Sequence, residues 1–140
     1  MSRSGYVDDY DQDDQWGHIR YRGMIASATR GKRGQAFFRD LLAALDAMPA
    51  KRLIRNDLIR EDSTGYENVC TLGALGRARR IDMTNLDPDD AETVAGKFDI
   101  ATPLAREVVW ENDEAGPWRE TPEARWLRVR TWVASQIKEA

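Results

Sequence analysis

The 140-residue chain is predicted to be mainly α-helical, a compact single-domain bundle of about five to six helices. Three observations favour this class. A regular apolar stripe occupies residues 34–48, and Asp-Pro or Thr-Pro dipeptides begin at positions 87, 102 and 121. Residues 69–76 are uncharged in a chain that is 32% charged. We expect this uncharged run to begin a buried central helix against which the other helices pack.

Residues 1–15 are predicted to form a disordered acidic tail, whereas residues 16–140 form the helical domain. Two interpretations of the tail are open. It is either a solvated segment that aids solubility, or an anionic arm that occupies a basic groove meant for nucleic acid or folds back on the basic third of this chain. The candidate contacts of such an arm are Asp8, Asp9, Asp11, Asp13 and Asp14.

The first predicted helix covers residues 16–29, with Trp16 marking where packing begins. Its apolar face is irregular and consists of Ile19, Met24, Ile25 and Ala28. The glycine-bracketed segment 30–34 is expected to break the chain before the next helix.

The clearest helix is predicted over residues 34–48, because Phe37, Leu41 and Leu45 fall on one stripe. Pro49 ends this helix, since it lacks an amide donor and restricts the residue before it. Residues 53–69 are expected to include a short β-hairpin, with Asp62–Gly65 as the turn between strands at 58–61 and 66–69.

Helix starts are predicted at the three proline dipeptides. Asp87 would cap a helix with Pro88 at its first position, and Thr102-Pro103 and Thr121-Pro122 would open two more.

The net charge of −3 conceals an uneven distribution. Residues 1–15 carry −4, residues 16–60 carry +7 and residues 61–140 carry −6, which sum to −3. The basic third either packs beside the acidic remainder or offers a face to an acidic partner or to phosphate.

Nucleophilic catalysis would require a base beside Cys70, the single cysteine, and His18 is the single histidine. No local pattern ties these two residues together, so Cys70 is interpreted as a small buried hydrophobe. One Cys and one His also make a metal site improbable, and we expect no cofactor. We therefore predict a protein without enzymatic activity, and a cryptic enzyme centred on Cys70 with Asn112-Asp113 is the third hypothesis.

Two polar segments are candidate binding sites. Asn112-Asp113 sits where a helix is expected to end, and forms either a capping turn or a small polar site beside the core. Arg30, Lys32 and Arg33 surround the start of the next helix, where backbone amides and cations together suit an anion. Their spacing is not that of a nucleotide-binding loop.

Residues 89–110 have the pattern of a helix-turn-helix, with Asp99 at the turn position where glycine is usual. The outward surface of its second helix would include Thr102, Arg106 and Glu107. Only Arg106 suits phosphate or guanine, and Glu107 and the acidic flanks would repel a DNA backbone. Packing is therefore favoured over DNA reading for this motif.

Over residues 16–137 the chain resembles a family of small proteins of tailed bacteriophages and prophages. The resemblance lies in residues 30–54, beginning Arg30-Gly31-Lys32-Arg33-Gly34-Gln35, and in Cys70-Thr71-Leu72-Gly73-Ala74-Leu75, Val94-Ala95, Asn112-Asp113-Glu114 and Thr121-Pro122-Glu123. It implies a phage accessory protein, and such proteins often bind and block a host protein. Inhibition of a defence system such as a CRISPR effector is one option among several.

The first hypothesis is thus a non-catalytic protein of the host cytoplasm that binds a host protein or nucleoprotein complex through charged surfaces. The candidate contacts are the basic segment Arg30–Arg33 and the acidic tail. The alternative is a nucleic-acid-binding regulator that uses the basic segment 16–60 or the helix-turn-helix-like segment 89–110. No membrane role is expected, because no apolar run approaches the ~20 residues of a membrane span.

Overall fold

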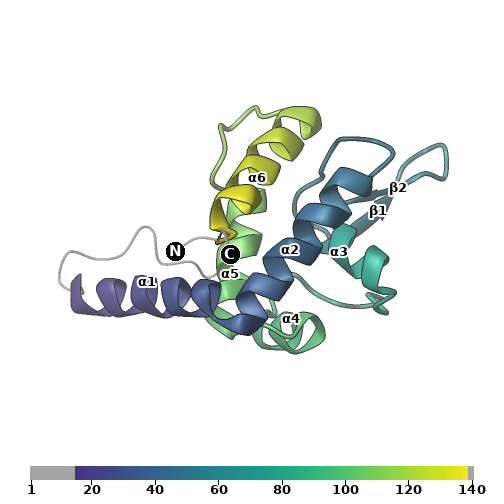
Figure 1. Ribbon diagram of the computed structural model, residues 1–140. Coiled ribbons are helices and arrows are strands. Elements are labelled where there is room, and N and C mark those ends of the chain that lie inside the picture. The colour runs from purple at the N-terminus through teal and green to yellow at the C-terminus, as the bar shows by residue number, and fades with distance from the viewer. Residues whose placement is uncertain (1–14, 139–140) are drawn as a thin grey trace.

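The computed structural model describes residues 15–138, which form six helices and one antiparallel hairpin (Figure 1). The mainly helical class predicted from the sequence is confirmed. The elements in chain order are α1 (Gln15–Arg30), α2 (Lys32–Ala47), β1 (Ile59–Glu61), β2 (Glu67–Val69), α3 (Thr71–Arg79), α4 (Ala91–Phe98), α5 (Thr102–Asp113) and α6 (Pro122–Gln136).

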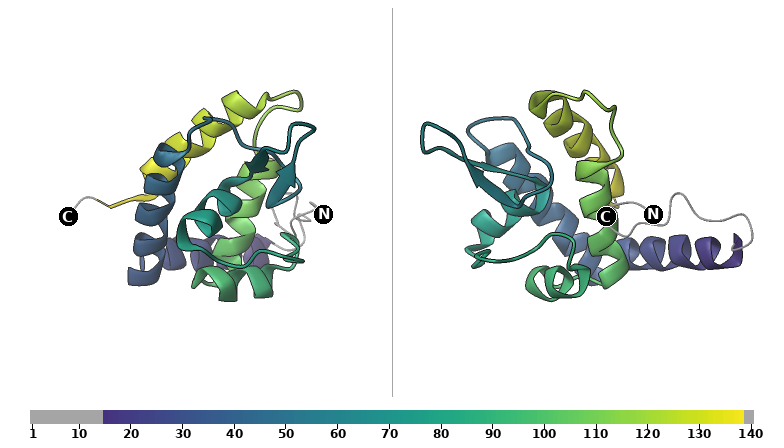
Figure 2. Two further views of the ribbon diagram at one scale, coloured as in Figure 1. Left: turned by 90° about the vertical axis from the view of Figure 1, so that its right-hand side faces the viewer. Right: turned by 180° about the vertical axis from the view of Figure 1, so that it is seen from behind.

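Helix α2 is the central element of the bundle, and it packs against both α3 and α6. Helices α4 and α5 pack together and α5 contacts α3, which closes the other side of the core. Helix α1 contacts α2 and α5, and the part of α1 farthest from α2 projects beyond the body of the molecule (Figures 1 and 2). The packed helices therefore leave one end of α1 outside the bundle.

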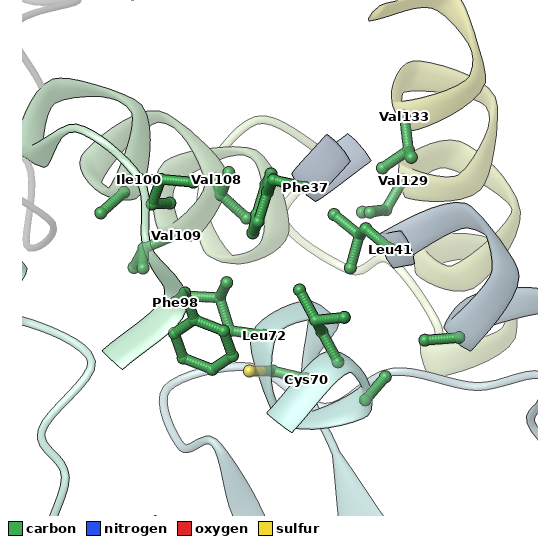
Figure 3. Packing of buried hydrophobic residues seen from close by; sticks show 14 of the residues in the cluster. Phe37, Leu41, Cys70, Leu72, Phe98, Ile100, Val108, Val109, Val129 and Val133 are labelled. Atoms are coloured by element: carbon green, nitrogen blue, oxygen red, sulfur yellow. The ribbon is translucent and has the colours of Figure 1, made fainter. Parts of the chain in front are cut away.

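The core is formed by large apolar side chains from α2 to α6 (Figure 3). The apolar stripe predicted for α2 points inward, and Phe38 also meets the Trp132 ring of α6 edge to face at 5.5 Å. The uncharged run expected to start a central helix does so, because every residue from 71 to 76 is buried in α3. Fully buried side chains include Phe37, Phe38, Leu41, Leu45, Leu72, Leu75, Val94, Phe98, Leu104 and Val108.

A sharp corner joins α1 to α2. Gly31 alone separates the two helices, so α2 begins at Lys32, two residues before the predicted start. A β-carbon at Gly34 would lie 1.9 Å from the Ala28 carbonyl oxygen, so only glycine permits this close approach. The carboxamide of Gln35 then fastens the corner, donating to the Thr29 and Gln136 carbonyls and accepting from the Lys138 amide.

The hairpin was predicted correctly. Strands β1 and β2 pair with Ile59 opposite Val69 and Glu61 opposite Glu67. Asp62 organises the turn, since its Oδ1 accepts hydrogen bonds from the Thr64 and Tyr66 amides. The Thr64 hydroxyl, which donates to the same oxygen at 2.6 Å, and these amides hold the pKa of Asp62 below its usual range. Gly65 supplies the positive φ of 84° that the turn requires.

The first of the three predicted helix starts was misplaced. Asp87 accepts from the Asp89 amide in a local turn, and Asp90 is the residue that caps α4 by accepting from the Thr93 amide. Helix α5 begins at the predicted Thr102-Pro103, although Ala101 and not Thr102 is its cap residue. The third start is correct: the Thr121 hydroxyl accepts from the Ala124 amide at 3.1 Å.

None of the helices within residues 15–138 combines the length and the apolarity that crossing a membrane would require.

Candidate interaction surfaces

Cys70 caps the N-terminus of α3, with its Sγ accepting from the Gly73 amide at 3.4 Å. The side chain is buried, and this burial raises the pKa of the thiol to about 11. The crevice beside it is also lined by Asn112 and Asp113, so the structure does bring the three residues of the third hypothesis together. Its volume is about 10 Å³, which is room for little more than one water molecule. A protonated thiol in so small a space is poorly suited to nucleophilic attack.

Asn112 is a structural residue that joins three segments. Its Oδ1 accepts from the amide and the hydroxyl of Thr71 at 2.9 and 2.6 Å, and its Nδ2 donates to the Ile54 carbonyl at 2.9 Å. The same Nδ2 donates to Asp113, whose carboxylate also accepts from the Asn56 amide. These bonds engage both the oxygen and the nitrogen of the carboxamide. The predicted polar site therefore holds the end of α5 against α3 and against the loop that contains Ile54 and Asn56.

The predicted basic contacts lie together at the corner between α1 and α2. Arg30, Lys32 and Arg33, called the corner cations below, are all exposed. Lys32 and Arg33 line a hollow of about 220 Å³, and Arg33 reaches Asp99 across it at 3.3 Å.

The far wall of that hollow was not anticipated. Ile100, Ala101 and Leu104 line it, so the first turn of α5 faces the first turn of α2. Neither helix has a side-chain cap at this end, and the positive ends of two helix dipoles therefore border the hollow beside the corner cations. The corner thus gathers three exposed cations and two helix N-termini, although Asp99 offsets part of the charge of Arg33.

The acidic residues proposed as an anionic arm, Asp8, Asp9, Asp11, Asp13 and Asp14, lie outside the residues that the structure describes.

Helices α4 and α5 have the connectivity of the predicted helix-turn-helix. Asp99 adopts the left-handed conformation, with φ 55°, at the position where glycine is usual. The outward surface predicted for α5 differs from the one observed, because Glu107 is 4% exposed and pairs with Arg22 of α1 at 2.6 Å. Helix α1 therefore packs on the face of α5 that would have to approach a DNA groove.

The apolar surface of α1 was missed in the sequence, and the predicted inner face of this helix is wrong in part. Of its four residues, Ile25 is buried and Ala28 half-buried, but Ile19 and Met24 are 57% and 52% exposed. Trp16, expected to begin the packing, is 75% exposed. At 100° per residue, positions 16, 19 and 24 lie on the side of the helix opposite Ile25, and that geometry could have identified two separate faces.

A second missed feature lies along the segment 51–55, which runs between the start of α6 and strand β2. Three cations of the segment 51–55 lie over aromatic rings. The distances to the ring centroids are 5.4 Å for Lys51 over Trp126, 5.3 Å for Arg52 over Tyr66 and 5.7 Å for Arg55 over Trp118. These rings come from β2, the loop 114–121 and α6, so sequence proximity does not show the pairing.

Within residues 15–138, no group of three or more His, Cys, Asp or Glu side chains is placed to hold a metal ion. Comparison with protein-family models, curated proteins and solved structures gave no match to the chain.

Proposed function

We propose that the protein is a non-catalytic binding protein that docks helix α1 into an apolar groove with an acidic rim on a partner protein. The observation that carries the proposal is the α1 stripe, defined as the outward side chains of Trp16, Ile19 and Met24, which are 52–75% exposed. An isolated exposed apolar residue needs no explanation, but three on one face of a projecting helix do.

The geometry of the stripe suits the recognition of a helix by a groove. At 100° per residue, positions 16, 19 and 24 span about 140° of the half of α1 that faces away from Ile25. Trp16 and Ile19 have the three-residue spacing of anchor residues in helix-in-groove complexes, and Met24 extends the apolar surface along the helix. Tryptophan is also among the residues that contribute most to binding energy at protein interfaces. Because the inner face of α1 is fixed to α5 through Arg22 and Glu107, the stripe is presented on a rigid support.

The charge of the helix defines the chemistry of the partner. Helix α1 contains no acidic residue, and besides Arg22, which pairs with Glu107, it carries Arg20 and Arg30. Lys32 and Arg33 continue the positive charge past its C-terminal end. A complementary groove is apolar along its floor and carries carboxylates along its rim.

The resemblance to tailed-phage proteins supplies the biological setting of this proposal. In that setting the partner is a host protein or a nucleoprotein complex, and occupation of its groove modulates or inhibits it. Host takeover and inhibition of a defence system, including a CRISPR effector, are the roles we favour.

The test uses the full chain as bait in a bacterial lysate, followed by purification of the captured protein and calorimetric titration against it. Trp16→Ala with Ile19→Ala is expected to weaken binding at least about 30-fold, the loss typical of an interface anchor. Arg20→Glu should weaken binding and reduce its salt dependence.

Leu127→Ala is the matched control, since Leu127 is 61% exposed but lies on α6. This variant should bind like the wild type. Full binding by the Trp16/Ile19 variant to the purified partner would overturn the proposal. Self-association of the bait that the same variant abolishes would instead assign the stripe to a homodimer and would also overturn it.

A further inference from the structure

We propose a second binding site, for single-stranded nucleic acid, along the segment 51–55, where Arg52 lies over Tyr66 and Arg55 lies over Trp118. These four residues are called the aromatic–arginine ridge below. It lies on different elements from the α1 stripe, so it goes beyond the proposed docking of a partner protein.

The ridge contains two of the three cation–aromatic pairs, because the third is internal. Lys51 donates to the carbonyls of Asp46 and Met48 at the end of α2, and Trp126 donates to the Leu45 carbonyl. That pair therefore caps a helix. Trp118, in contrast, is 80% exposed and Tyr66 is 37% exposed, which leaves aromatic surface open beside a guanidinium in each remaining pair.

Both arginines retain their charge for a ligand. Arg52 donates to the neutral Asn68 carboxamide at 2.9 Å, and within residues 15–138 no ion pair links Arg52 or Arg55 to a carboxylate. Arg60 adds a further cation beside Arg55, whose carbonyl oxygen it contacts at 3.4 Å, although Asp57 lies 3.8 Å from it. Two carboxylates also lie beside the ridge, since Glu67 lines a crevice together with Arg52 and Tyr66 and pairs across the hairpin with Glu61.

The segment that carries these arginines is fixed on both sides. The Leu53 amide donates to the Pro122 carbonyl at 3.0 Å, and the Leu53 carbonyl accepts from Arg125 at 2.9 Å. On the hairpin side the Ile54 amide donates to the Val69 carbonyl at 3.0 Å. Arg52 and Arg55 are therefore held in place before any ligand binds, which lowers the ordering cost of binding.

Exposed aromatic rings beside arginine side chains match the chemistry of single-stranded nucleic acid. Proteins that bind single-stranded nucleic acids stack bases on exposed aromatic rings and place arginine or lysine along the phosphates. The bases of a duplex are already stacked and paired, so an exposed indole gains little from them. An acidic protein segment would use the charges but not the aromatic faces.

The experiment is a fluorescence-anisotropy titration of the full chain with a labelled 15-nucleotide oligo-dT at 50 mM NaCl. Binding is expected, with an affinity that falls as NaCl is raised to 200 mM because phosphate contacts release counterions. Trp118→Ala should weaken oligo-dT binding about 10-fold, which corresponds to the loss of one stacked base. Arg55→Glu should weaken oligo-dT binding and make it depend less steeply on the NaCl concentration. Since Trp118 is so exposed, its variant should melt like the wild type.

Trp16→Ala is the matched control and should leave oligo-dT binding unchanged, whereas it impairs the protein docking proposed above. The two proposals can therefore fail separately. The absence of binding at 50 mM NaCl would overturn the inference, as would wild-type affinity in Trp118→Ala. Equal binding of a duplex, or equal competition by poly-glutamate, would show a surface that recognises only charge and would likewise overturn it.

Discussion

Arg22 of α1 donates a 2.6 Å hydrogen bond to Glu107 of α5, whose side chain is only 5% exposed. This ion pair determines what each helix can offer to a partner. It turns Glu107 away from solvent and leaves the opposite side of α1 outward, so the α1 stripe is available and this face of α5 is not.

Replacing Arg22 with Met should therefore destabilise the protein, because it leaves Glu107 with less compensation for its burial. We expect the free energy of unfolding in urea to fall by about 1–2 kcal/mol, less than for a fully buried pair since Arg22 is partly exposed. The control is Arg33→Met, whose pair with Asp99 is 62% and 78% exposed and which should change stability by less than about 0.5 kcal/mol. Equal losses of stability in Arg22→Met and Arg33→Met would contradict the conclusion that the Arg22–Glu107 pair holds α1 against α5.

Gly73 is predicted to be irreplaceable in α3. A β-carbon there would lie 2.0 Å from the Leu58 carbonyl oxygen, a backbone atom that can move only with the chain around it. Gly73→Ala should lower the free energy of unfolding by about 1–3 kcal/mol through overpacking, as measured by urea titration.

Gly96, within α4, is the matched position because a β-carbon there meets nothing within 4 Å. Gly96→Ala should raise stability by about 0.5–1 kcal/mol, since alanine loses less backbone entropy in a helix. Wild-type stability of Gly73→Ala would show that α3 does not approach the backbone of Leu58 so closely.

Asn112 should be far more important for stability than a typical surface amide. Asn112→Ala leaves the Thr71 amide and the Ile54 carbonyl without their side-chain partner, and we expect a loss of about 2–3 kcal/mol by thermal or urea unfolding. Asn68→Ala, which removes a partly exposed amide in β2, should cost less than about 1 kcal/mol. A small loss of stability in Asn112→Ala would contradict the structural role of Asn112 and would again make it a candidate for a functional residue.

Cys70 should make stability depend on alkaline pH. Burial raises the pKa of the folded-state thiol from 9.0 to about 11, so between these values the folded chain holds a proton that the unfolded chain releases. This contribution is complete below pH 9 and is lost as the pH rises toward 11, by about 2 kcal/mol in the unfolding free energy.

Cys70→Ser is the reference, because serine keeps the helix cap and does not titrate in this range. The difference in unfolding free energy between the wild type and Cys70→Ser should narrow by about 2 kcal/mol between pH 9 and pH 11. Parallel pH profiles would mean that the thiol is accessible to water.

The features predicted correctly are those that local chemistry determines. The stripe of α2, the buried small residues of α3, the Asp62 turn and the Thr121 cap each depend on residues within a few positions of one another. Where neighbouring residues compete for one role, the sequence is ambiguous: Asp87 and Asp90 can both cap a helix, and the turn formed by Asp87 leaves the cap to Asp90.

The binding surfaces were harder to foresee, because they depend on which elements meet. Ile19 and Met24 are apolar and so were placed inward, but only the side of α1 that carries Ile25 meets the rest of the chain. Similarly, Arg55 and Trp118 are 63 positions apart, and nothing near either residue indicates that they stack.

The Gln35 carboxamide has a consequence for the order in which the chain folds. Thr29 lies at the same corner as Gln35, whereas Gln136 and Lys138 follow Gln35 by 101 and 103 positions. The corner between α1 and α2 is therefore completed only when the end of α6 docks against it, although the two helices are adjacent in the sequence. Local unfolding at the end of α6 accordingly loosens a corner that was formed more than 100 positions earlier in the chain.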